Sequence, residues 1–164
     1  MPNWCMNNLT ISHDDPAKLQ EFVDAYNSGE TCQHYIPHPP EIMKSMEDPK
    51  NNDWYNWRCN TWGTKWDFGL EEYGEPATVE NNQISISFNT AWSPPIEIYQ
   101  KFYELGYTVH ASYWEPGMAF CGWWTDGEDD YYSYVDKNEI PVGLWDEFGM
   151  ADFFEEFDET EADA

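Results

Sequence analysis

The feature that most constrains this chain is its charge, because 32 Asp and Glu face seven Lys and Arg in 164 residues, a formal net charge of −25 at pH 7. Small domains usually carry a net charge within about 8 of zero, and a larger excess strains the compact state by self-repulsion. Folding therefore needs a strong core. Aromatic residues make up 18% of the chain. Because each aromatic side chain buries ~150–250 Å², we expect one aromatic-rich domain rather than a disordered chain.

The same charge restricts the partners that can bind. Phosphate contacts to DNA or RNA need clustered Lys and Arg, so direct nucleic-acid binding is not expected. A chain of this length should be about 40 Å across, and about 40 Å of B-DNA carries about 24 negative charges. Such a surface favours a basic nucleic-acid-binding protein as the partner. An acidity that serves solubility alone is the alternative interpretation.

Three features of the sequence bear on where the protein works. It contains no run of 18 apolar residues, so no membrane span is expected. The first five residues, Met-Pro-Asn-Trp-Cys, lack the basic and apolar segments of a signal peptide. The four cysteines are far apart and form no Cys-x-x-Cys pair. These features predict a cytoplasmic protein with free thiols and no membrane contact.

The periodicity of apolar residues predicts an α+β fold, since alternation is typical of strands and i, i+3, i+4, i+7 spacing of helices. The simplest topology is a ferredoxin-like antiparallel sheet with helices on one face and an insertion near 37–82. We assign residues 1–140 to this single domain. The predicted elements are a strand over 4–12, a helix over 16–29, a short strand near 32–36, a strand over 84–89, a helix over 93–106 and strands over 107–114, 118–124 and 131–135.

The C-terminal segment 141–164 differs from the rest, because it holds nine acids and no base. Its apolar residues Met150, Phe153, Phe154 and Phe157 nevertheless recur at the spacing of one helix face. This pattern predicts an acidic amphipathic helix. We expect its apolar face to dock on the sheet, and docking on a partner is the alternative.

Four sequence blocks together resemble a known family: PNWCMNNLTI at 2–11, NTWGTKWD at 60–67, FNTAWSPP at 88–95 and YWEPGMAFCGWW at 113–124. They are similar to the YubB-like family of phages and plasmids. The resemblance implies a ferredoxin-like domain and an origin in a mobile element, and it implies no catalytic residue. Phage and plasmid proteins often counter host defences such as restriction or CRISPR, and some of these inhibitors are acidic DNA mimics.

No group of residues carries a recognisable chemistry. The chain has no GxSxG, P-loop or GxGxxG motif. Cys32, His34 and His38 have the spacing of zinc ligands, but Cys59 is the only distant candidate for the fourth position. The acids around Gly127 do not match the spacing of a calcium loop. We therefore expect no enzyme activity, no cofactor and no metal.

The preferred hypothesis is a non-enzymatic phage or mobile-element inhibitor that acts as a nucleic-acid mimic. Carboxylates would replace phosphates in the basic groove of a host defence protein. The residues expected to bind this partner are Asp126, Glu128, Asp129, Asp130, Asp146, Glu147, Asp152, Glu155, Glu156 and Asp158.

The alternative hypothesis is a protein that sequesters a nucleotide signal in an aromatic pocket. Indole rings stack on nucleobases, and a nearby lysine can contact a phosphate. The same rings could instead fill the core. The residues of this alternative pocket are Trp62, Lys65, Trp66, Trp92 and Trp114.

Overall fold

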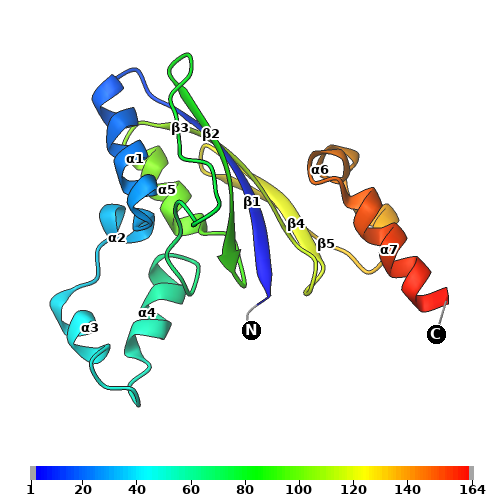
Figure 1. Cartoon of the computed structure of the whole chain (residues 1–164), viewed down its shortest axis with the longest axis horizontal. Helices are drawn as coiled ribbons and strands as arrows, with labels where there is room; N and C mark the ends of the chain where they lie inside the picture. Colours follow the sequence, from blue (N-terminus) through cyan, green and yellow to red (C-terminus); the bar gives the residue numbers. More distant parts are fainter. Residues whose placement is uncertain (1–2, 163–164) are drawn as a thin grey trace.

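A five-stranded antiparallel sheet lies at the centre of the computed structural model (Figure 1), which describes residues 3–162 apart from the side chains of residues 157 and 159–162. The predicted α+β class is confirmed. The strand order is β2-β1-β3-β4-β5, so β2, α5 and β3 form a split β-α-β unit with β1 between the two parallel strands. The strands are β1 (Trp4–Ser12), β2 (Gln83–Ala91), β3 (Thr108–Glu115), β4 (Phe120–Thr125) and β5 (Glu128–Ser133).

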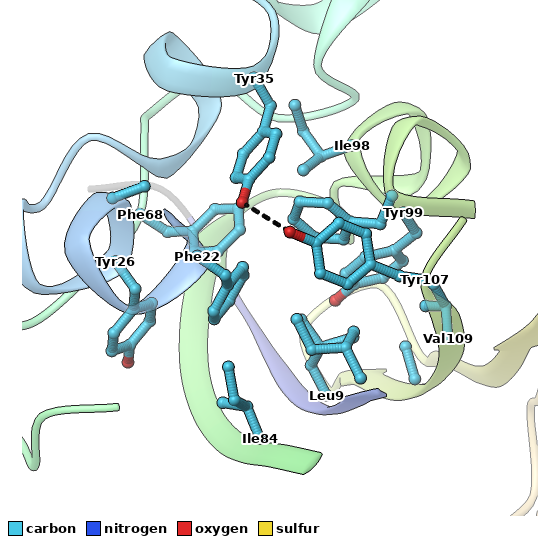
Figure 2. Packing of buried hydrophobic residues seen from close by; sticks show 14 of the residues in the cluster. Leu9, Phe22, Tyr26, Tyr35, Phe68, Ile84, Ile98, Tyr99, Tyr107 and Val109 are labelled. Atoms are coloured by element: carbon cyan, nitrogen blue, oxygen red, sulfur yellow. Dashed lines mark hydrogen bonds between the residues drawn. The ribbon is translucent and has the colours of Figure 1, made fainter. Parts of the chain in front are cut away.

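One face of the sheet is covered by α1 (Pro16–Ser28), α2 (Thr31–Tyr35) and α5 (Ile96–Glu104). The predicted helix α1 begins where Asp15 accepts a hydrogen bond from the Ala17 N–H at 2.9 Å and ends at Gly29, whose φ is 83°. Aromatic rings dominate the core beneath these helices. Figure 2 shows Tyr35 and Tyr107 joined by their hydroxyl groups, with an oxygen–oxygen distance of 3.4 Å.

The opposite face is covered in part by α6 (Val142–Glu147) and α7 (Met150–Ala162), which follow the short 3-10 helix η1 (Lys137–Glu139). The prediction of helices on one face concerned the domain 1–140, and the sequence analysis named no face for the C-terminal helix. Leu144 and Met150 are fully buried against Trp114 and Cys121. This second cluster exists because Trp114 and Cys121 point away from the main core on their alternating strands. Phe157, part of the predicted apolar face, lies outside the described side chains.

The segment 31–35 differs from the sequence prediction, and a distant residue explains the difference. Residues 31–35 form helix α2 instead of a strand because the Asp67 carboxylate accepts the backbone N–H groups of Cys32 at 2.6 Å and Gln33 at 2.9 Å. Two further helices, α3 (Pro40–Ser45) and α4 (Asp53–Thr61), lie within the predicted insertion 37–82 and extend away from the sheet (Figure 1).

The strand β5 begins three residues earlier than the sequence predicts. Asp126 and Gly127 both have positive φ, 44° and 97°, and they connect the paired residues Thr125 and Glu128. This is the geometry of a two-residue hairpin turn, in which Asp-Gly is a favoured sequence. Pairing with β4 thus draws the acidic residues that follow the turn into the edge strand.

Candidate protein-interaction site

Residues of the four sequence blocks hold one end of the sheet together. The backbone N–H of Trp92 donates to the Asn3 carbonyl at 2.8 Å. The Thr64 hydroxyl donates to the Ala91 carbonyl at 3.1 Å, which attaches the loop before β2 to the end of that strand. The buried Glu115 carboxylate accepts the N–H groups of the turn that follows it. These residues stabilise the fold and form no reactive group.

The five residues of the predicted nucleotide pocket do not line one cavity, so the prediction of a single pocket formed by all five is wrong. Trp62 is fully buried in the main core and donates its ring N–H to the Ile36 carbonyl at 2.8 Å. Trp114 is buried on the opposite face of the sheet, in the cluster beneath α6 and α7. Trp66 and Trp92 are half-exposed. Core packing therefore explains Trp62 and Trp114 without a ligand.

A smaller cluster of aromatic and cationic groups lies at α4. The Trp54 and Trp66 rings stack with centroids 5.6 Å apart, and the Arg58 guanidinium lies 5.0 Å from the Trp54 ring. The Lys65 ammonium lies 4.8 Å from the Trp66 ring. Residues 37–66 contain four bases and four acids, so this segment carries no net charge. In charge it therefore differs from the rest of the chain, which is strongly acidic.

The zinc-like spacing near α2 does not produce a metal site. His34 contacts the Glu21 carboxylate at 3.0 Å, whereas His38 accepts a hydrogen bond from the Arg58 guanidinium at 2.9 Å. Burial and the Arg58 charge lower the pKa of His38, which keeps its ring neutral and able to accept. Within residues 3–162, no group of three or more His, Cys, Asp and Glu is placed to hold a metal ion.

The predicted acids near the β4–β5 turn do not form a single row. The Asp126 carboxylate accepts the Val109 backbone N–H at 2.7 Å, so it supports the turn. Glu128 and Asp130 lie on the face of the sheet that α6 covers, while Asp129 lies on the other face and accepts the Tyr113 hydroxyl at 2.6 Å. Neighbouring residues of a strand alternate between faces, which prevents a continuous ridge here.

The predicted acids of α6 and α7 are all exposed. Glu147 lies over the sheet, where its carboxylate accepts the Ser112 hydroxyl at 2.7 Å and the Asn8 side-chain amide at 3.4 Å. Asp158 pairs with Lys137 at 3.0 Å. The remaining residues of this set are Asp146, Asp152, Glu155 and Glu156.

A groove along the outer edge of β2 is a feature that the sequence analysis did not predict. Three hollows of about 340, 670 and 340 Å³ follow one another along this strand, from Gln83 to Asn89, and the second and third extend over the strand to Asn8 of β1. The segment 69–80 forms the other wall and contributes Glu71, Glu75 and Glu80. A sequence signal for the groove exists: the nine residues of β2, QISISFNTA, include no charged side chain.

Comparison of the chain with protein-family models, curated proteins and solved structures finds no match. The function is therefore inferred from the residues of this chain. Among residues 3–162, no helix has the length and apolar character that crossing a bilayer requires. The features that remain for a functional argument are the exposed carboxylates, the uncharged edge strand and the cluster at α4.

Proposed function

We propose that the protein is a non-enzymatic inhibitor that binds a basic, nucleic-acid-binding host protein in place of nucleic acid. The observation that supports this proposal is the excess of carboxylates that the chain cannot neutralise itself. If each of the seven Lys and Arg paired with a different acid, 32 − 7 = 25 carboxylates would remain. The charge is therefore available to a partner.

Carboxylates can replace phosphates because both accept hydrogen bonds from the forked guanidinium of Arg and from Lys. Attraction between a surface of this charge and a basic groove is long-ranged and speeds association at low salt. It weakens as the Debye length falls from about 10 Å at 0.1 M salt to about 3 Å at 1 M. The predicted partner-binding acids of α6 and α7 outnumber those near the β4–β5 turn, so we place the main contact there.

The origin and location of the protein belong to the same proposal. The resemblance to the YubB-like family supports a phage or plasmid origin, and hence action in the cytoplasm of the host cell. The split unit formed by β2, α5 and β3 supports descent from a ferredoxin-like domain. The proposed target is a defence protein of the restriction or CRISPR kind.

The test is capture of partners from host lysate, followed by competition with DNA. We expect a basic DNA- or RNA-binding protein that is released by added DNA and by high salt. Replacing Asp146, Asp152 and Glu155 by their amides should weaken binding at least about tenfold. The matched control replaces the exposed Asp14, Glu30 and Glu97 by their amides and should change binding much less. Capture that neither DNA nor high salt reverses would contradict the proposal.

The cluster at α4 supports a second candidate function, binding of a nucleotide signal. Trp66 is 40% exposed and Lys65 lies beside its ring, so a base could stack there while a phosphate contacts the ammonium group. We expect cyclic nucleotides or dinucleotides to raise the melting temperature of the protein, and Trp66→Ala to abolish the shift. The half-exposed Trp92 gives the control, since Trp92→Ala should leave the shift intact. An unchanged melting temperature in the wild-type protein would rule out this candidate.

A further inference from the structure

The outer edge of β2 presents backbone groups that no other strand uses. β2 is the terminal strand of the sheet, and β1 occupies its other side. The bond from the Trp92 N–H to the Asn3 carbonyl fixes which residues face β1, because hydrogen-bonded positions alternate along an antiparallel pair. Ser85, Ser87 and Asn89 therefore direct their N–H and C=O groups outward. In the described structure, none of these outward backbone groups has a hydrogen-bond partner.

The wall opposite this edge is fixed in place at three points. The Leu70 N–H donates to the Tyr26 carbonyl at 2.8 Å, and the Ala77 N–H donates to the Asn27 side chain at 2.9 Å. Glu80 and Gln83 exchange backbone hydrogen bonds of 2.9 and 3.0 Å, which closes the groove at one end. Segment 69–80 is thus attached to α1 and to the start of β2, and the hollows lie between this segment and the strand.

The groove is lined by acidic side chains and by no basic ones. Glu71, Glu75 and Glu80 lie along its wall, and Glu147 borders it from the other face of the sheet. The three hollows along β2 are lined by no Lys, Arg or His. A second copy of this chain would bring the same carboxylates against them, so pairing of two β2 edges is disfavoured. A segment that carries Lys or Arg is favoured.

We propose that this groove binds an extended, Lys- or Arg-rich segment of the partner as a sixth strand of the sheet. Main-chain hydrogen bonds to Ser85, Ser87 and Asn89 supply affinity, as in other cases of strand addition. Side chains of the added strand alternate between two faces. Those on one face reach Glu71 and Glu75, and those on the other reach Glu147. The inference rests on the proposed function in one respect, the basic character of the partner.

The first measurement uses a synthetic peptide of about seven Lys and Thr residues, with Lys at both odd and even positions so that both faces of the added strand carry charge. We expect it to bind the full chain, and we expect the amide protons of Ser85, Ser87 and Asn89 to become protected from hydrogen exchange. A peptide of the same sequence in which every backbone N–H is methylated keeps the charge but lacks the donors of a strand, and it should bind at least about tenfold more weakly. Equal binding of both peptides, or no protection at these three amides, would overturn the inference.

Variants of the protein separate strand addition from attraction between charges. Ser87→Pro removes an outward N–H and leaves the bonds to β1, a position where an edge strand tolerates proline. It should weaken peptide binding at least about tenfold. Ser87→Ala loses the same hydroxyl bond to Asn8 and should bind normally. If Ser87→Pro binds as well as Ser87→Ala, the peptide does not pair with β2.

A charge control lies within the wall itself. The double variant Glu71→Gln, Glu75→Gln should weaken peptide binding severalfold and reduce its salt dependence. Glu72 is an exposed neighbour that does not line the groove, so Glu72→Gln should bind normally. Equal effects of the two changes would show that total charge, and not the groove, attracts the peptide.

Failure of the groove can be distinguished from failure of the proposed function. If Ser87→Pro captures a basic host protein that DNA displaces, and does so as tightly as Ser87→Ala, the proposed function holds and strand addition is wrong. If the peptide adds to β2 but lysate yields no partner that DNA displaces, the groove holds and the proposed function is wrong.

Discussion

The two edge strands of this sheet differ in where they carry their charge. β5 has the sequence EDDYYS, with acids at three of six positions, whereas β2 has none in nine. Charged side chains on an edge strand are a common means of preventing unwanted pairing. The acids near β2 stand beside the strand, on segment 69–80 and at Glu147. The acids on β5 repel an acidic strand that would pair with its edge. The acids beside β2 leave its backbone accessible and attract a basic strand.

The largest expected effect is on stability, through the packing of α6 and α7 against β3 and β4. Met150, the first residue of α7, is fully buried against Trp114 of β3 and Cys121 of β4. Met150→Ala should lower the free energy of unfolding by about 2–5 kcal/mol, because the cavity it leaves can close only in part. Val142, which is 74% exposed, gives the control. Val142→Ala should change stability by less than about 0.5 kcal/mol in the same urea titration. Equal losses would mean that α7 does not support the sheet.

The next effect tests whether the acids of β5 protect its edge. Glu128→Gln with Asp130→Asn removes two carboxylates from one face of that strand, and we expect self-association to strengthen by about tenfold. Each like-charge pair across strands costs about 0.2–1 kcal/mol, and several pairs would meet in a dimer. Analytical ultracentrifugation over a range of concentrations measures the change. The same number of charges removed from α7, by Asp152→Asn with Glu155→Gln, should leave the protein's association state unaltered.

The smallest effect concerns Asp129, the acid of β5 that accepts a hydrogen bond from Tyr113 of β3. Tyr113→Phe removes the hydroxyl donor to Asp129 and should cost about 1 kcal/mol, since Asp129 is exposed to water. Burial raises the pKa of Tyr113 well above its ordinary value of about 10. The folded state therefore holds this proton more tightly than the unfolded chain does. The contribution of Tyr113 to stability should be complete below pH about 10 and should fall as pH rises further.

A matched substitution on β5 separates this effect from the loss of a hydroxyl in general. Tyr131 is 55% exposed, so Tyr131→Phe should change stability little at any pH. Chemical denaturation of both variants at pH 7 and pH 10.5 measures the difference. If Tyr113→Phe shows the same stability deficit at both values, the proton of Tyr113 does not contribute as we infer.

Elements with local start and stop signals could be predicted from the sequence, and the others could not. Helix α1 has its own cap at Asp15 and its own end at Gly29, so its pattern was sufficient. Helix α2 depends on Asp67, a residue far along the chain, and its short pattern indicated a strand instead. The edge position of β2 followed from no local signal, because the neighbours of a strand are decided by the packing of the whole sheet.

The candidate site divides in the same way. The sequence by itself determined the charge of −25, the aromatic content of the core and the Asp126-Gly127 turn, since these depend on composition or on adjacent residues. Tertiary structure alone decided that Trp62 and Trp114 lie in separate clusters and that Asp129 faces away from Asp130. It also brought segment 69–80 beside an uncharged edge strand. Net charge depends only on which residues the chain contains, so the sequence determines it. A groove depends on where segments distant in the sequence lie relative to one another, so only the tertiary structure determines it.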